Sequence, residues 1–428
     1  MQLLLLLPSP KTPRMRLITS LMFLTLFIGQ CQSQFHPPQV EITEADTVGY
    51  DFFRQDDNQI ENAGYLEPLF RKMYLQRTRG GQKISIVHIG DSHILGNFLT
   101  REVRARLQSA FGDGGRGMVF PYKLAGTNGP KDYLVESGAR WYGSNCQRIL
   151  TPETPFGLSG FSLETTNLNA DLTFKLRDTA TAETRLFTKV TVFQHKLPSQ
   201  YDIEVHDALS GQKAEPFLED QYSQSFYFER PVSQMTVKAR KLTSQQKRLT
   251  IDGVSLENEL AGVVYHSIGV NGAKYQDFAR AKYFARGVAE LQPDLIILSF
   301  GTNEAQGKAD ADYLRRTMSN LTEQLLEQSP NSLILFTTPA DSYLRGKGFN
   351  PNMTDMSAVI RKFARDKGYA LWDLFSLSGG ENSAAEWKSR GLMSSDSVHY
   401  TKVGYAIQGK LLYQSLIKSY NGYAVGKP

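Results

Sequence analysis

Short apolar runs recur along this chain, and amphipathic segments follow several of them. Residues 84–90, read as Ile-Ser-Ile-Val-His-Ile-Gly, have the composition of a buried strand in a parallel sheet. Residues 100–111 carry apolar side chains at helical spacing, including Val103 and Leu107, and Thr100 is a suitable N-cap. The pattern therefore predicts a strand, a tight turn and a helix in this order.

The alternation of strand and helix resumes after residue 261 and continues toward the C-terminus. Strands are predicted at residues 263–268, 294–300, 332–337 and 369–373. Helices are predicted at residues 66–75, 275–291, 313–328, 356–367 and 405–420. Alternating strands and helices predict an α/β fold whose mostly parallel sheet is covered on both faces.

Residues 125–261 have a different pattern, because helical periodicity fades there and short β-rich runs take over. Strands are predicted at residues 171–176, 186–193, 201–206, 225–228, 235–239 and 249–256. This spacing predicts an inserted all-β domain, a β-sandwich or jelly roll, which divides the α/β domain into residues 34–124 and 262–428. Aromatic residues of the insert, such as Trp141 and Tyr222, either fill its core or form a platform for stacking sugars.

Residues 1–33 resemble a secretory signal peptide. Arginines precede an apolar run at residues 18–28, which is too short to span a bilayer comfortably. Cleavage is expected after Ser33, with a lipid attached to Cys31 as the rival interpretation. The protein is therefore expected in the bacterial periplasm or outside the cell, with no transmembrane helix in the mature chain.

Composition excludes several classes of protein. With 41% hydrophobic and 21% charged residues, the chain is typical of a folded globular protein. The net charge is only +5 and the chain has no block of lysines and arginines, so no nucleic-acid partner is expected. Removal of the signal would leave Cys146 as the sole cysteine, which excludes an internal disulfide and a zinc site built from cysteines.

Polar clusters that contain glycine follow three of the predicted strands. They are Gly-Asp-Ser-His at residues 90–93, Asn-Gly at residues 271–272 and Gly-Thr-Asn at residues 301–303. Because the carboxyl ends of parallel strands lie along one edge of a sheet, these clusters are expected to converge. A fourth cluster, Asp-Ser-Val-His at residues 396–399, lies in a loop just before the last predicted helix.

The four clusters contain the parts that a nucleophilic serine requires. Such a serine needs a base, a group that orients the base, and donors for an oxyanion. His399 is predicted to take the proton of Ser92, and Asp396 to hold the imidazole in the right tautomer. The backbone N–H groups of Ser92 and Gly272 and the side-chain amide of Asn303 are predicted to bind the oxyanion.

Two further motifs are weaker signals. Residues 112–117 match Gly-x-Gly-x-x-Gly, but they follow a helix and no helix begins after them, so nucleotide binding is rejected. A flexible loop near the site is expected instead, with Arg116 as a candidate substrate contact. His88 and His93 flank the Ser92 turn without a further ligand at matching spacing, so no metal is expected; His93 is predicted to line the pocket and contact substrate, or to pack beneath it.

The four clusters resemble those of the SGNH/GDSL hydrolase superfamily, which is named for Ser, Gly, Asn and His. His93 stands where the superfamily usually has leucine. This variant, the Phe-Gly-Asp-Gly-Gly-Arg-Gly stretch at residues 111–117, the β insert and residues 269–273 are most similar to secreted peptidoglycan O-acetylesterases. The resemblance implies a three-layer, flavodoxin-like α/β fold, an insert similar to a carbohydrate-binding module, and catalysis without a cofactor.

The sequence therefore predicts a serine esterase that removes O-acetyl groups from a cell-wall glycan, foremost from the N-acetylmuramic acid of peptidoglycan, through an acetyl-enzyme on Ser92. One alternative is an esterase that acts on acetylated xylan or another polysaccharide. A peptidoglycan O-acetyltransferase, which passes the acetyl group to a sugar hydroxyl, is a second. From another class, the alternative is a carbohydrate-binding envelope protein without catalysis.

Overall fold

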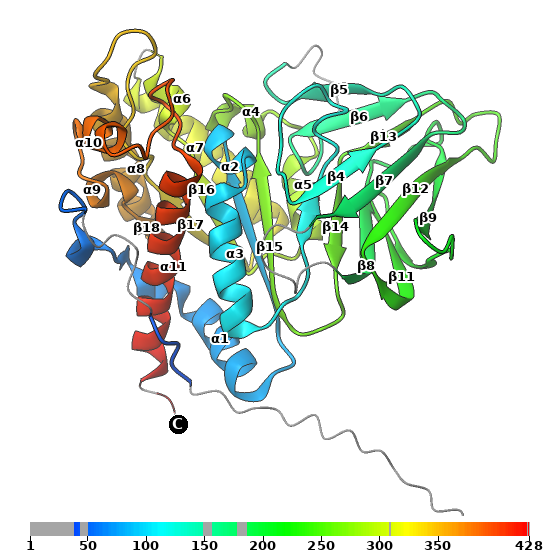
Figure 1. Ribbon diagram of the computed structural model, residues 1–428, viewed down its shortest axis with the longest axis horizontal. Helices are drawn as coiled ribbons and strands as arrows, with labels where there is room; N and C mark the ends of the chain where they lie inside the picture. The colour runs from blue at the N-terminus through cyan, green and yellow to red at the C-terminus, as the bar shows by residue number, and fades with distance from the viewer. Residues whose placement is uncertain are drawn as a thin grey trace, which may run out of the picture. The chain divides into compact units, whose positions relative to one another are not determined.

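The computed structural model describes residues 38–42, 50–148, 156–177, 186–307, 310–425 and 427 (Figure 1). The predicted signal peptide and the rival lipid site at Cys31 lie outside the described residues. Among the residues that are described, none of the helices has the length and hydropathy needed to traverse a bilayer.

A six-stranded sheet with the order β1-β18-β17-β16-β2-β15 forms the centre of the α/β part. The parallel strands are β2 (Lys83–Gly90), β15 (Gly262–Gly269), β16 (Leu295–Ser299), β17 (Leu333–Thr337) and β18 (Ala370–Trp372). The short strand β1 (Ile60–Glu61) pairs antiparallel with β18 at one edge. Taken in chain order, the parallel strands follow the flavodoxin-like sequence 2-1-3-4-5, which confirms the predicted fold class.

Helices cover both faces of this sheet because its strands are apolar on both sides. Along β2, Ile84 and Ile86 belong to one hydrophobic core, and Val87 and Ile89 belong to the other. The first core includes residues of α1 (Glu67–Arg79), α3 (Phe98–Phe111) and α11 (Lys402–Ala424), of which α3 and α11 lie side by side in Figure 1. The second includes residues of α4 (Tyr275–Ala279), α5 (Phe284–Glu290), α7 (Ala311–Gln328) and α8 (Asn352–Lys367). The result is the predicted three-layer arrangement.

The helix predicted at residues 275–291 is interrupted. The structure has α4 and α5 in its place, separated by residues 280–283. The backbone N–H of Tyr283 donates to the carbonyl oxygen of Phe156 in the insert at 3.2 Å, so this amide is not bonded within a continuous helix. Short helical segments that the sequence did not predict complete the α/β part: η1 (Gln55–Asp57), η2 (Ala63–Leu66), α2 (Ser92–Leu95), α6 (Thr302–Ala305), α9 (Leu374–Leu377) and α10 (Ser383–Ser389).

The insert consists of antiparallel sheets, as predicted. Their orders are β10-β11-β8-β14-β3, β4-β7-β12-β9 and β13-β6-β5. The strands are β3 (Gly117–Val119), β4 (Tyr133–Glu136), β5 (Tyr142–Asn145), β6 (Phe161–Thr165), β7 (Asp171–Leu176), β8 (Phe187–Phe193), β9 (Asp202–Asp207), β10 (Glu215–Glu219), β11 (Ser223–Val232), β12 (Gln234–Arg240), β13 (Leu249–Ile251) and β14 (Gly253–Glu257). The single strand predicted at residues 249–256 is therefore two strands, which belong to different sheets. The limits 125–261 remain a prediction, and β3 joins a sheet of the insert although it precedes residue 125.

The glycine-rich residues 112–117 are packed, and the expectation of a flexible loop near the site is wrong. The N–H of Gly114 donates to the carbonyl oxygen of Val263 at 3.0 Å, near the start of β15 and away from the carboxyl end. A Cβ on Gly115, whose φ is +118°, would lie 2.5 Å from Cα of Glu257. Glycine is therefore required here because two backbone segments approach each other closely.

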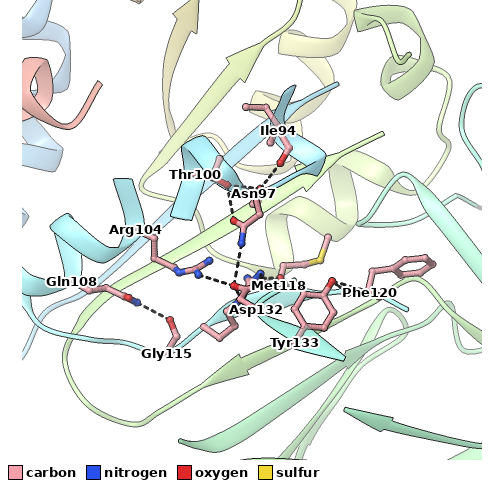
Figure 2. Close-up of polar contacts among 12 residues, drawn as sticks. Ile94, Asn97, Thr100, Arg104, Gln108, Gly115, Met118, Phe120, Asp132 and Tyr133 are labelled. Carbon is pink, nitrogen blue, oxygen red and sulfur yellow. Dashed lines mark hydrogen bonds and ion pairs between the residues drawn. The ribbon is translucent and has the colours of Figure 1, made fainter. Parts of the chain in front are cut away.

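Arg116 is a structural residue, which corrects its prediction as a substrate contact. Its side chain is 3% exposed, and its Nε lies 2.8 Å from Oδ2 of Asp132. Arg104 of α3 contacts the same oxygen at 2.8 Å, and Figure 2 shows Asp132 between Arg104 and Asn97. Burial alone would raise the pKa of Asp132, but the guanidinium groups of Arg116 and Arg104 hold this pKa well below its ordinary value. A guanidinium so enclosed cannot reach a substrate.

The aromatic residues of the insert divide between core and surface. Tyr133, Trp141 and Phe226 are buried and belong to the hydrophobic core. Tyr142 is 57% exposed. Tyr133, Trp141 and Phe226 therefore fill the core of the insert and cannot form a platform for stacking sugars.

Candidate active site

The turn after β2 presents Ser92 at the carboxyl end of the sheet. Gly90 ends the strand, and a Cβ there would lie 2.6 Å from the carbonyl oxygen of Ser299, so the neighbouring strand leaves room only for glycine. Asp91 caps the short helix α2, since its Oδ1 accepts from the N–H of His93 at 2.9 Å. Ser92 is the first residue of α2 and half-buried, so its N–H and its hydroxyl both remain available at the edge of the sheet.

Ser92, His399 and Asp396 form one hydrogen-bonded chain. Ser92 Oγ lies 2.8 Å from His399 Nε2, and His399 Nδ1 lies 2.6 Å from Asp396 Oδ2. Burial alone would raise the pKa of Asp396, but hydrogen bonds from the His399 ring and from the backbone N–H groups of His399 and Val398 lower it to about 2. The carboxylate is thus ionised near neutral pH and fixes the proton of His399 on Nδ1, which leaves Nε2 to accept the hydroxyl proton of Ser92.

The loop that carries Asp396 and His399 is held by its own hydrogen bonds. The N–H of Ser394 donates to the carbonyl oxygen of His399 at 2.8 Å, which closes the loop. Ser397, in the middle, adopts a positive φ of 57°. Lys388 Nζ donates to Ser397 Oγ at 2.7 Å and ties the loop to α10. These contacts place the carboxylate and the imidazole in a fixed relation.

The predicted oxyanion donors lie around the turn that carries Ser92, and they differ in whether they already donate a hydrogen bond. Among the described residues, the N–H groups of Ser92 and Gly272 have no hydrogen-bond acceptor. Gly272 has a φ of +73°, which favours glycine. Asn303 Nδ2, in contrast, donates to Asp91 Oδ2 at 3.0 Å and to the carbonyl oxygen of Ala273 at 3.1 Å. For Asn303 to donate to an oxyanion, one of these bonds must open.

Glu304 supports the strand-end turns, a role that sequence reasoning missed. Its Oε1 accepts from the N–H of Tyr275 at 3.0 Å, and its Oε2 accepts from the N–H of Gly301 at 3.1 Å. Burial raises the pKa of both Glu304 and Asp91 to about 7, and the charge of Glu304 contributes to the shift of Asp91. The Gly-Thr-Asn-Glu sequence at residues 301–304 contains no pattern that indicates where the glutamate side chain points.

His93 packs behind the imidazole of His399. The two ring centroids are 5.1 Å apart, and His93 Nδ1 lies 2.9 Å from the hydroxyl of Tyr405. Burial lowers the pKa of His93 to about 3, so the ring is neutral near pH 7. A small cavity of about 40 Å³ lies beneath the turn, and His93 is among its lining residues. This position corresponds to the second of the two predicted alternatives for His93, in which the side chain packs beneath the pocket; a contact with substrate stays a prediction.

His88 is buried in the sheet, and both of its ring nitrogens have hydrogen-bond partners. Its Nδ1 lies 2.7 Å from the hydroxyl of Tyr265, and its Nε2 lies 2.6 Å from Ser299 Oγ. Within the described part of the chain, no group of three or more histidine, cysteine, aspartate or glutamate side chains could hold a metal ion. The chemistry that this arrangement supports is nucleophilic attack by Ser92 with His399 as the base.

Comparisons with known proteins agree with this geometry. Residues 251–407 match the model of the GDSL-like Lipase/Acylhydrolase family, a segment that includes Gly272, Asn303, Asp396 and His399. No curated protein sequence matches the chain significantly. Ser92 lies before the matched segment because the insert separates it from the other three clusters.

One solved structure shares the fold of this chain over most of its length, and others resemble it more distantly. A structure of a peptidoglycan O-acetylesterase superposes with a TM-score of 0.71 at 23% sequence identity, covering 85% of this chain and 99% of the other. A family two carbohydrate esterase from Cellvibrio japonicus has a TM-score of 0.28 at 13% identity, covering 67% and 99%. A lipase/acylhydrolase from Enterococcus faecalis has a TM-score of 0.30 at 16% identity, covering 37% and 77%. The family match over residues 251–407 and the flavodoxin-like fold with its strand-end clusters make this chain similar to the SGNH/GDSL hydrolases.

Proposed function

We propose that this protein is a serine esterase that removes O-acetyl groups from a cell-wall glycan, with the N-acetylmuramic acid of peptidoglycan as the favoured sugar. The observation that carries the proposal is the hydrogen-bonded chain from Ser92 through His399 to Asp396 at the carboxyl edge of the sheet. The fold shared with a peptidoglycan O-acetylesterase over almost the full length of that chain supports the choice of substrate.

The first half of the reaction transfers the acetyl group to the protein. Ser92 Oγ forms a bond to the acetyl carbonyl carbon while His399 Nε2 takes the hydroxyl proton. The tetrahedral intermediate then collapses, the bond between this carbon and the sugar oxygen breaks, and His399 gives the proton to the departing oxygen. Asp396 steadies the imidazolium in between, since its low pKa keeps it ionised.

The second half releases acetate. Water takes the place of the sugar, and His399 Nε2 removes a proton as the water oxygen attacks the acetyl carbon. The ester bond to Ser92 breaks, acetate leaves, and the proton returns to Ser92 Oγ. Both halves pass through an oxyanion, for which the N–H groups of Ser92 and Gly272 and the amide of Asn303 are the proposed donors.

The proposed location of the protein is the periplasm or the exterior of a bacterial cell. It rests on the predicted signal peptide at residues 1–33 and on the substrate, because a cell-wall glycan lies outside the cytoplasmic membrane.

Acetate release tests the proposal. The purified chain without residues 1–33 and its Ser92→Ala variant are incubated in parallel with O-acetylated peptidoglycan and with acetylated xylan. We expect faster release from peptidoglycan, lowered by several powers of ten in Ser92→Ala. A preference for xylan would keep the mechanism and change the substrate. No release from either polymer, with no labelling of Ser92 by a fluorophosphonate, would refute the esterase and favour a binding protein.

A further inference from the structure

One side chain of the insert reaches the candidate active site. Strand β5 ends at Asn145, and a tight turn follows in which the N–H of Arg148 donates to the carbonyl oxygen of Asn145 at 3.0 Å. Asn145 Oδ1 also accepts from the N–H of Gln147 at 3.1 Å. The neighbouring N–H of Cys146 donates to the carbonyl oxygen of Gly160 at 2.8 Å, which ties the turn to the start of β6. The backbone of Gln147 is therefore fixed.

The carboxamide of Gln147 lies directly over Gly272. Its Nε2 is 2.9 Å from the point that a Cβ on Gly272 would occupy, whereas its Cδ and Oε1 are both 3.8 Å from that point. The nitrogen end of the amide thus faces the glycine, and the absence of a side chain on Gly272 is what leaves room for it.

The insert is also bonded to the residue before this glycine. Asn271 Nδ2 lies 3.2 Å from Thr127 Oγ1 and 2.6 Å from Asn128 Oδ1, two residues from the beginning of the insert. The strand-end turn at residues 271–272 is thus contacted by the insert at two separate places. This attachment holds the backbone of Gln147 beside Gly272, which limits the positions that its side chain can take and favours a preorganised donor.

The side-chain amide of Gln147 is free to donate a hydrogen bond at the candidate site. Gln147 Nε2 has no hydrogen-bond acceptor among the described residues, although its side chain is half-buried. The N–H groups of Ser92 and Gly272 are also free there. Asn303 Nδ2 already uses both of its hydrogens on Asp91 and Ala273. Gln147 Nε2 therefore joins the backbone N–H groups of Ser92 and Gly272 among the donors that have no acceptor in the described part of the chain.

We propose that Gln147 is a catalytic residue that donates a hydrogen bond from Nε2 to the carbonyl oxygen of the ester as this oxygen becomes an oxyanion. It acts together with the N–H groups of Ser92 and Gly272, so a residue of the insert forms part of the oxyanion hole. This assignment rests on the proposed esterase activity, and it makes the insert a component of the reaction centre in addition to any role in holding polymer.

The test uses a small ester without a sugar, p-nitrophenyl acetate, beside O-acetylated peptidoglycan. Because loss of an oxyanion donor lowers the rate by about 10²- to 10³-fold in a fully enclosed site, we expect about a 10- to 100-fold fall in kcat for Gln147→Ala at this half-buried position. KM should change little, since the bond strengthens only as charge develops. Gln147→Glu keeps the shape but has no donor on its ionised tip, and it should lose at least as much. Gln212→Ala, at an exposed glutamine of the insert, is the matched control with full activity.

Four outcomes separate the explanations. An equal fall in kcat on both substrates, with an unchanged melting temperature and a parallel fall in the rate of inactivation by diisopropyl fluorophosphate, supports the proposal. A fall on peptidoglycan alone overturns it, because Gln147 would then contact the sugar. Full activity of Gln147→Ala on both substrates also overturns it. If the wild type hydrolyses the small ester through Ser92 but no glycan, the glycan substrate is refuted while the test of Gln147 remains valid.

Discussion

Replacing Asp132 by asparagine tests whether the buried cluster of Figure 2 holds the fold together. The side chains of Asp132, Arg104 and Arg116 are 6%, 5% and 3% exposed. The carboxylate contacts Arg104 Nη2 at 2.8 Å, Arg116 Nε at 2.8 Å and Nη2 at 3.1 Å, and Asn97 Nδ2 at 3.1 Å. Asn keeps the volume of the side chain, so no cavity forms, but the two guanidinium groups lose their buried counter-charge.

The expected loss follows from that uncompensated charge. Removing one partner of a buried ion pair costs about 3–5 kcal/mol, because the remaining charge stays out of contact with water. The asparagine also turns an amide donor toward groups that themselves only donate. We therefore expect the free energy of unfolding of Asp132→Asn to fall by about 3–5 kcal/mol, measured by urea titration with tryptophan fluorescence.

Glu204 supplies the matched control. It also contacts several cationic or basic groups, Lys213, Arg240 and His206, but its side chain is 21% exposed. Because solvent screens such a cluster, Glu204→Gln should lower the free energy of unfolding by less than about 1 kcal/mol. The reasoning about burial is refuted if Asp132→Asn loses no more than Glu204→Gln.

The dependence on pH gives a second check. Since Arg116 and Arg104 hold the pKa of Asp132 well below the value of about 4 in an unfolded chain, its contribution is complete above that value. The contribution disappears as the pH falls through the folded-state pKa. The difference in stability between wild type and Asp132→Asn should therefore be constant near neutral pH and shrink in strong acid.

Further predictions concern the candidate site. Asn303→Ala should lower kcat about a hundredfold or more on acetyl esters, and undiminished turnover would remove this residue from the oxyanion hole. Gly272→Ala should also lower kcat, because its φ of +73° is strained for alanine and the new methyl group would meet Gln147 Nε2 at 2.9 Å; wild-type kinetics would contradict that crowding. Burial raises the pKa of Asp91 to about 7, so the folded protein retains this proton to higher pH than the unfolded chain. The contribution of Asp91 to the free energy of unfolding is therefore complete below about pH 4 and is lost as the pH rises to 7. Urea titrations between these pH values should show a smaller change in the free energy of unfolding for Asp91→Asn than for the wild type. An equal change in both proteins would argue against a buried proton on Asp91.

The spacing of apolar residues along the chain predicts those elements whose burial follows a regular period. Apolar runs predicted all five parallel strands, and β7 has the predicted bounds of residues 171–176. The rule that strand ends share one edge of a sheet then predicted that Ser92 and the residues around it would meet. The spacing of Asp396 and His399 in their loop also predicts a hydrogen bond between the carboxylate and the imidazole, which the structure contains.

Contacts that depend on tertiary packing left no such signal. Arg116 stands in a glycine-rich stretch that is typical of an exposed loop, and its burial depends on Asp132, which follows 16 residues later, and on Arg104 of α3. Gln147 is one polar residue in a turn, and its place over Gly272 results from how the insert packs on the strand ends. No local pattern of apolar and polar residues encodes either arrangement.

The packing of residues 112–117 on β15 and the pairing of β3 with β14 couple the unfolding of the α/β part to that of the insert, and they constrain how the insert can diverge in evolution. A segment that leaves α3 is laid on the central sheet and then becomes an edge strand of the insert, so neither part can lose its structure without removing hydrogen bonds from the other. The two parts should therefore melt in a single calorimetric transition. An exchange of the whole insert between relatives would break these shared bonds, so divergence in substrate preference is expected to proceed through point substitutions within it.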